Sequence, residues 1–166
     1  KAFFGKGVWS KTKLADLVKS YSDLGPRQLR ENYFSRNFGG KFFSFRDARI
    51  IGYIRDHIEK NASNLNSKER NILLASLLYS ADKIANTVGH YDAYRIRPNV
   101  EDRFNFKLIT PIDCKAKVSI YREDANNLVK KITPDIVYID PPYNSRQYSR
   151  FYHVLENLAQ WKKPEL

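Results

Sequence analysis

The sequence has 166 residues, which suits one domain or one and a half small ones. Apolar residues make up 42% and the chain contains 11 Tyr and 10 Phe, so it has the side chains for a core and is not a disordered protein. Its one cysteine, Cys114, excludes an internal disulfide and a cysteine-based zinc site. The histidines His57, His90 and His153 share no ligand spacing, so we expect no metal.

Basic residues outnumber acidic ones by 29 to 18, and the excess is uneven. Residues 1–100 contain 18 basic and 9 acidic residues, whereas residues 101–166 contain 11 and 9. A basic first part indicates contact with a polyanion such as nucleic acid, although many proteins are basic for no specific reason. The most apolar stretch, residues 72–79, is far shorter than the roughly 20 residues of a membrane helix, and no signal peptide is present. We therefore expect a cytoplasmic protein without a membrane segment.

Helices dominate the predicted elements of the first part. Apolar residues at helical spacing predict a helix over residues 10–24, and an aromatic, glycine-rich stretch over 33–45 predicts a loop or short hairpin. Ser44 has the features of an N-cap, with Asp47 three residues later, so a helix should follow to about residue 60. The next helix, over about residues 68–86, is apolar nearly all round and should be central and buried.

The second part has a different pattern. Residues 87–114 are irregular, and then strands and helices alternate over residues 117–121, 124–131, 135–139 and 147–161. This order predicts a mainly helical, basic region over residues 1–114, suited to contact with a polyanion. Residues 115–166 should form part of an α/β catalytic domain, with too few strands to complete a sheet. The chain begins at Lys1 and contains no methionine, so we expect it to be an internal segment of a longer protein.

One motif carries clear chemistry: Asp140-Pro141-Pro142-Tyr143, followed by Asn144. It comes directly after the β-branched run 135–139, at the strand end where open α/β sheets bind ligands. The alternative is a plain Asp-Pro turn followed by a core tyrosine.

The motif suits transfer of a methyl group to an exocyclic amino group. Such a nitrogen is a poor nucleophile because its lone pair is delocalised into the base. The Asp140 carboxylate and the Pro141 carbonyl, held by the proline-restricted backbone, could accept its two hydrogens and localise that lone pair. Tyr143 offers a ring on which a flipped base could stack. Direct in-line displacement follows, with no covalent enzyme intermediate.

The segment from Val137 to Trp161, with its Asp-Pro-Pro-Tyr motif, resembles the DNA adenine methylase family of restriction–modification systems. Two earlier stretches, 32–35 and 78–94, resemble the same family. The resemblance implies an adenine-N6 methyltransferase that uses S-adenosyl-L-methionine and acts on double-stranded DNA beside a cognate restriction endonuclease. It also implies an α/β fold with a partial Rossmann-like methyltransferase sheet. Beside that sheet it implies a mainly helical DNA-recognition region, which would be residues 1–114.

The resemblance also assigns roles to residues. Asp140 and Tyr143 carry over as the amino-group acceptor and the stacking ring. Asp124 follows the predicted strand at 117–121, where similar enzymes contact the cofactor's adenine, and Asp140 would also face the cofactor. For Asp124 a helix N-cap is an equally good interpretation. The expected DNA contacts flank the motif or follow the long buried helix: Asn144, Arg146, Arg150, Asn86, Tyr91, Tyr94 and Arg95.

The cofactor loop of such enzymes, Phe-x-Gly-x-Gly, is matched in letters by residues 3–7, but no strand can precede that position. We therefore expect the true loop to lie before Lys1. A second hypothesis follows, in which the chain is a non-catalytic DNA-binding module that keeps the motif. A third is an RNA or protein-glutamine methyltransferase, since related motifs act on other planar nitrogens.

Overall fold

The computed structural model describes residues 7–24, 29–96, 99–112, 117–141 and 147–166. Within these ranges it contains helices and two isolated β-bridges, which pair Gly39 with Phe43 and Thr87 with Tyr94. The helices are α1 (Lys11–Ser22), α2 (Tyr33–Phe38), α3 (Phe45–Lys60), α4 (Ser67–Asp82), α5 (Ala125–Leu128) and α6 (Tyr148–Gln160). None of them is long and apolar enough to cross a membrane.

Side-chain caps define where the main helices begin. The Ser44 hydroxyl accepts a hydrogen bond from the Asp47 amide at 3.0 Å, which confirms the predicted N-cap of α3. At α4, Asn66 and Glu69 form a reciprocal capping box. α1 begins after Ser10, whose hydroxyl accepts from the Lys13 amide. The first amides of α1, α3 and α4, which have no partner within their own helix, are thus partly satisfied by neighbouring side chains.

The prediction of a loop or hairpin over residues 33–45 is wrong in its first half, because α2 occupies Tyr33–Phe38. Asn32 and Ser35 cap this short helix with two reciprocal hydrogen bonds, of 3.0 and 2.9 Å. A tight turn then brings Phe43 back to Gly39, and its residue Gly40 has a φ of +73°, a conformation that glycine adopts without steric cost.

α2 can approach α3 closely because Gly52 has no side chain. A Cβ atom at Gly52 would lie 2.1 Å from Oδ1 of Asn32, the N-cap of α2. The same Asn32 side chain donates from Nδ2 to the Arg49 carbonyl of α3 at 2.9 Å. The α2 cap is therefore also the contact that joins the two helices.

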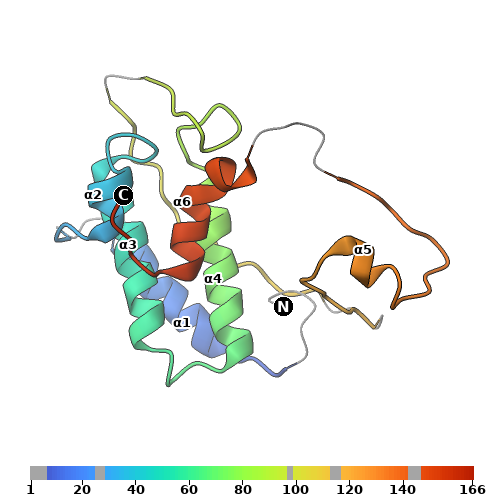
Figure 1. The fold of residues 1–166 in the computed structure, drawn as a ribbon. Coiled ribbons are helices and arrows are strands. Elements are labelled where there is room, and N and C mark those ends of the chain that lie inside the picture. Colours follow the sequence, from blue (N-terminus) through green and yellow to red (C-terminus); the bar gives the residue numbers. More distant parts are fainter. Residues whose placement is uncertain (1–6, 25–28, 97–98, 113–116, 142–146) are drawn as a thin grey trace.

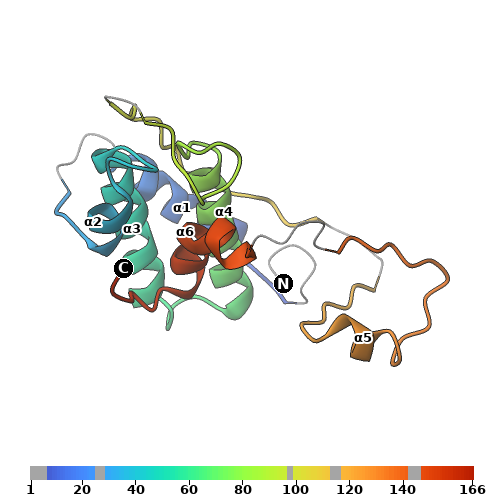
Figure 2. The ribbon, with the colours of Figure 1, turned by 45° about the horizontal axis from the view of Figure 1, so that its top comes forward.

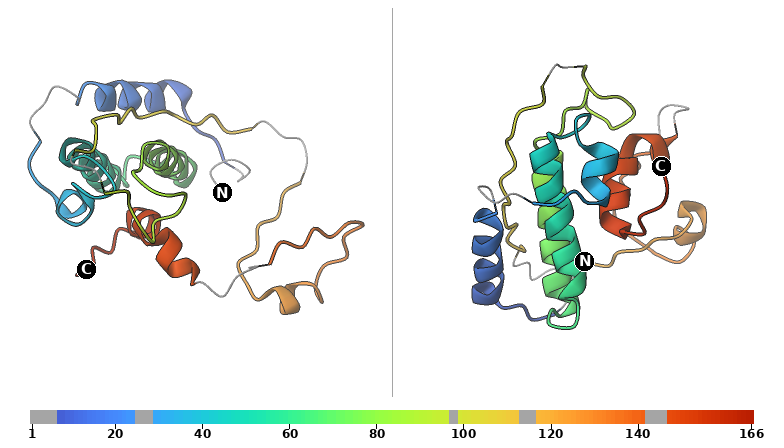
Figure 3. Two further views of the ribbon diagram at one scale, coloured as in Figure 1. Left: turned by 90° about the horizontal axis from the view of Figure 1, so that it is seen from above. Right: turned by 90° about the vertical axis from the view of Figure 1, so that its left-hand side faces the viewer.

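α3 and α4 form a central hairpin, with α1 on one side and α2 and α6 on the other (Figure 1; Figure 3). The left view of Figure 3 shows α1 and α6 on opposite sides of the α3–α4 pair. The predicted central position of the second long helix is confirmed, since α4 buries residues around much of its circumference: Lys68, Glu69, Ile72, Leu73, Ser76, Leu77, Ser80 and Ala81.

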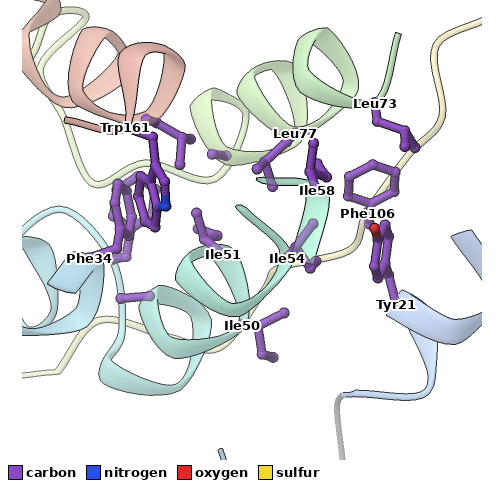
Figure 4. Packing of buried hydrophobic residues seen from close by; sticks show 14 of the residues in the cluster. Tyr21, Phe34, Ile50, Ile51, Ile54, Ile58, Leu73, Leu77, Phe106 and Trp161 are labelled. Atoms are coloured by element: carbon purple, nitrogen blue, oxygen red, sulfur yellow. The ribbon is translucent and has the colours of Figure 1, made fainter. Parts of the chain in front are cut away.

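The core runs the length of this hairpin (Figure 4). Phe34 of α2 and Trp161 lie at one end, Ile51 and Leu77 lie in the middle, and Tyr21 of α1 lies at the other. Tyr21 also packs edge-on against Phe106, with ring centroids 5.1 Å apart. Burial of these apolar side chains drives the assembly of the helices.

The irregular segment 99–112 is attached to the hairpin by side chains instead of by a sheet. Oδ2 of Asp47 accepts from the amides of Arg103 and Phe104 at 2.7 and 2.9 Å. The hydroxyls of Ser80 and Ser76 accept from the amides of Lys107 and Ile109. Burial raises the pKa of Asp47, and the two amide bonds oppose that rise.

α6 completes the core although it belongs to the segment predicted as catalytic. Val154 and Leu158 are buried, and the fully buried Arg55 of α3 donates from Nε to the Leu158 carbonyl at 2.8 Å and from Nη2 to the Ala159 carbonyl at 3.3 Å. The Arg55 guanidinium also lies 5.3 Å from the centre of the Trp161 ring. A buried cation thus caps the carboxyl end of α6.

Residues 117–141 lie outside the helical body (Figure 1; Figure 2). Every residue of this segment except Leu128 is exposed. The strands predicted at 117–121 and 135–139 do not form in this structure, because neither segment has a neighbouring strand among the described residues to satisfy its backbone. The predicted short helix forms as α5, over fewer residues than expected.

Candidate nucleic-acid interface and methyl-transfer motif

The first two residues of the motif, Asp140 and Pro141, are exposed to solvent at the end of the segment 117–141. Tyr143, Asn144 and Arg146 lie outside the described residues. The predicted pair of acceptors and its stacking ring therefore stay a prediction, with the Asp140 carboxylate accessible to a ligand.

Asp124 is the N-cap of α5. Its Oδ1 accepts from the amides of Asn126 and Asn127 at 2.9 and 3.2 Å, so the N-cap interpretation is confirmed. Both Asp124 and Asp140 are exposed, and the described residues around them build no wall that would enclose a cofactor. The described residues of this chain therefore do not by themselves fit S-adenosyl-L-methionine.

Two of the predicted DNA contacts are buried: Asn86, which directly precedes loop 87–95, and Tyr91 within that loop. Nδ2 of Asn86 donates to the carbonyls of Lys41 and Arg95, at 2.9 and 2.8 Å. The Tyr91 hydroxyl donates to Asp82 at 2.9 Å, and burial, followed by the nearby Asp82 carboxylate, raises the pKa of that phenol far above its usual range. Asn86 and Tyr91 thus fix the loop internally, and their role as base or phosphate contacts stays a prediction.

Tyr94 and Arg95, at the end of the same loop, are exposed as a DNA contact requires. The Thr87–Tyr94 bridge closes the loop, and Tyr94 packs edge-on against Phe42 with ring centroids 5.3 Å apart. The loop therefore presents one aromatic and one basic side chain to solvent from an anchored base.

The loop also docks onto the first turns of α6. The Tyr91 amide donates to the Phe151 carbonyl at 3.0 Å, and the His90 and Phe151 rings stack with centroids 4.6 Å apart. Arg150, an exposed predicted DNA contact, pairs its Nε with Asp92 at 3.0 Å. This docking joins the loop to the helix that follows the motif.

A cavity of about 370 Å³ opens where the loop meets α6, lined by Asp92, Ser149, Arg150 and His153. Nδ1 of His153 lies 3.0 Å from the Arg150 carbonyl, which can only accept, so this nitrogen carries the proton. The His153 ring also packs against Phe38 and Phe42, with ring centroids 6.2 and 5.8 Å away.

Sequence reasoning missed Asp92 and Arg55. Their partners lie far along the chain, at Arg150 and at Leu158 and Ala159, so no local pattern marks them. No group of three or more His, Cys, Asp or Glu side chains suited to a metal ion occurs in the described ranges.

Comparison with known families decides the relationship of the chain. The family model for D12 class N6 adenine-specific DNA methyltransferases matches residues 9–166. The chain belongs to this methyltransferase family. The match covers both the helical region and the Asp-Pro-Pro-Tyr motif, and it confirms the resemblance found in the sequence.

Curated relatives include DNA modification enzymes. The chain is 40% identical over 129 residues to "Modification methylase StsI" of Streptococcus sanguinis, covering 75% of this chain and 20% of the relative. It is 32% identical over 160 residues to "Type II methyltransferase M.NlaIII" of Neisseria lactamica (89% and 46%), and 33% over 158 residues to "Type II methyltransferase M.CviAII" of Paramecium bursaria Chlorella virus 1 (91% and 48%). The chain thus spans between a fifth and a half of these relatives. No solved structure matches it.

Proposed function

We propose that the protein containing this chain is a site-specific DNA adenine-N6 methyltransferase of a restriction–modification system. The observation that carries the proposal is the family match over residues 9–166, which includes Asp140 and Tyr143 in a complete motif. S-adenosyl-L-methionine would supply the methyl group, as the family implies. Its binding would require chain beyond the described residues.

Asp140 and Pro141 would act on the substrate amino group. The carboxylate and the carbonyl would each accept one hydrogen of the adenine N6 group, so that its lone pair is localised and directed towards the methyl donor. Tyr143 would stack on the flipped base and offset part of the few kcal/mol that extrusion from the duplex costs. The exposure of Asp140 is compatible with this role.

We further propose that residues 117–121 and 135–139 become strands of a Rossmann-like sheet when they pair with strands outside this chain. Support comes from Ile136, Tyr138 and Ile139, which are 87%, 89% and 76% exposed. A run of such apolar side chains is normally covered in a stable protein. Residues 1–114 would form the DNA-recognition region and residues 115–166 part of the catalytic domain, with α6 of the second region packed against the helices of the first.

The DNA contacts in this proposal come from exposed or motif-flanking residues: Tyr94, Arg95, Arg150, Asn144 and Arg146. Double-stranded DNA would be the substrate, a cognate endonuclease the partner, and the cytoplasm the location.

The test is a matched pair of substitutions in the full-length protein. Asp140→Ala should abolish methyl transfer to DNA while DNA affinity persists, because the carboxylate acts on the amino group. Asp135→Ala removes an exposed carboxylate of the same segment and should leave transfer intact. Transfer that continues in the Asp140 variant would refute the assigned role.

One observation favours the second candidate, a non-catalytic DNA-binding module: Asp124 and Asp140 are both exposed, and the described residues around them form no walled pocket. Titration calorimetry of the full-length protein with S-adenosyl-L-methionine separates the two. Binding supports the enzyme, and its absence at millimolar concentration leaves the module.

A further inference from the structure

The cavity between loop 87–95 and α6 gathers groups that suit an anion. Arg150 contributes a guanidinium, Ser149 a hydroxyl, and His153 one wall. Asp92 pairs with the Arg150 side chain, with its Oδ1 3.0 Å from Nε. Two kinds of donor therefore face one space of about 370 Å³.

The position of this cavity matters for DNA. Ser149 and Arg150 lie in the first turn of α6, nine and ten residues after Asp140. Tyr94 and Arg95, the exposed pair, stand on the loop that forms the opposite wall. A strand that places a base at the motif would thus pass close to the cavity.

Asp92 is the feature that the DNA-binding assignment of Arg150 alone does not explain. Its carboxylate holds the guanidinium at 3.0 Å, and the two side chains are 25% and 70% exposed. Exposed ion pairs contribute little to stability because water screens them. A phosphate diester could therefore replace the Asp92 carboxylate. Its oxygens would then accept hydrogen bonds from the N–H groups of the Arg150 guanidinium.

We propose that this cavity is a DNA-phosphate site in which Ser149 and Arg150 bind one backbone phosphate, and that Asp92 occupies the guanidinium until DNA arrives. The inference rests on the proposed function, since it assigns a phosphate of the same DNA substrate. Asp92 is a competitor for the site and a positioning residue for Arg150.

The test uses full-length protein and a short mixed-sequence DNA duplex, with affinity measured across a salt series. Arg150→Ala should lower the affinity about tenfold and reduce the slope of log affinity against log salt by about one, as loss of one phosphate contact requires. Asp92→Asn should raise the affinity severalfold, because it frees the guanidinium. The double variant should match Arg150→Ala alone.

Lys19→Ala is the control. It removes the same charge from α1, on the opposite side of the α3–α4 pair, and should leave affinity and slope close to those of the unmodified protein (Figure 3). Equal effects of Lys19→Ala and Arg150→Ala would overturn the site, as would an Asp92→Asn variant that binds no more tightly. Circular dichroism of each variant confirms that the helices are intact.

The outcomes separate this inference from the proposed function. Methyl transfer by the unmodified protein with an unchanged Arg150→Ala affinity would leave the function standing and overturn the phosphate site. If no methyl transfer is detected, but Asp92→Asn raises the DNA affinity and Arg150→Ala lowers it, the proposed function is overturned and the phosphate site is supported.

Discussion

Arg55 should be one of the most important residues for stability, and Arg55→Met is the substitution that tests this. Methionine keeps much of the apolar stem but removes the charge and the donors. The carbonyls of Leu158 and Ala159 would then lose their donors at the buried end of α6. The contact with the Trp161 ring would also lose its cation.

The expected cost follows from these contacts. A buried acceptor left without its partner costs about 1–3 kcal/mol, and two carbonyls are affected. The cation–π contact adds about 1 kcal/mol. Removing the buried charge also removes its desolvation cost, which offsets part of this loss of stability. We therefore expect a net loss of about 3 kcal/mol in the free energy of unfolding.

Urea unfolding of the full-length protein, followed by circular dichroism, measures this loss. The transition should move by roughly 1–2 M urea. Glu59→Gln is the matched control, because it removes the half-exposed carboxylate that Arg55 Nη1 contacts at 2.7 Å and leaves both carbonyl bonds in place. It should cost less than about 1 kcal/mol. An Arg55→Met variant no less stable than Glu59→Gln would refute the reasoning.

Three further predictions concern the helical body. Gly52→Ala should lower the free energy of unfolding by about 2 kcal/mol, despite the higher helix propensity of alanine, because the new Cβ displaces the Asn32 cap; a more stable variant would contradict this. Asp47→Ala should cost about 2–4 kcal/mol in urea unfolding, and Asp47→Asn less, because the amide oxygen can still accept from residues 103 and 104; equal losses would disprove the acceptor role. Burial, and then Lys60, lowers the pKa of His57 below 6.5, so the unfolded chain binds more protons between the two pKa values. Stability should be full above pH 6.5 and fall as pH drops through that window, whereas a His57→Gln variant should lack this part of the pH dependence.

Local signals in the sequence sufficed for the helices with strong caps and periodicity. Ser44 and Asp47 mark the start of α3, and the continuous apolar run of α4 marks its burial. α2 was missed because the aromatic, glycine-rich composition of residues 33–45 outweighed a signal that was present, the Asn32–Ser35 capping box.

Non-local contacts could not be predicted from the sequence. Asn86 and Tyr91 have the residue types of DNA contacts, yet tertiary hydrogen bonds to Lys41, Arg95 and Asp82 bury them. The β-branched run 135–139 has strand propensity, but propensity without a paired neighbour does not make a strand.

The motif itself was identifiable because its four residues are adjacent in the sequence, and the family match over residues 9–166 includes them. The cavity between loop 87–95 and α6 was not identifiable, because Asp92 and Arg150 meet only through the docking of that loop onto α6.

The central claim is that Asp140 and its neighbours direct a methyl group to the N6 nitrogen of adenine. The most direct measurement is mass spectrometry of nucleosides from unmethylated DNA after incubation with the full-length protein and S-adenosyl-L-methionine. We predict N6-methyladenine, absent when Asp140 is replaced by alanine. Methylated cytosine as the product, or N6-methyladenine formed equally by the Asp140→Ala protein, would contradict the account.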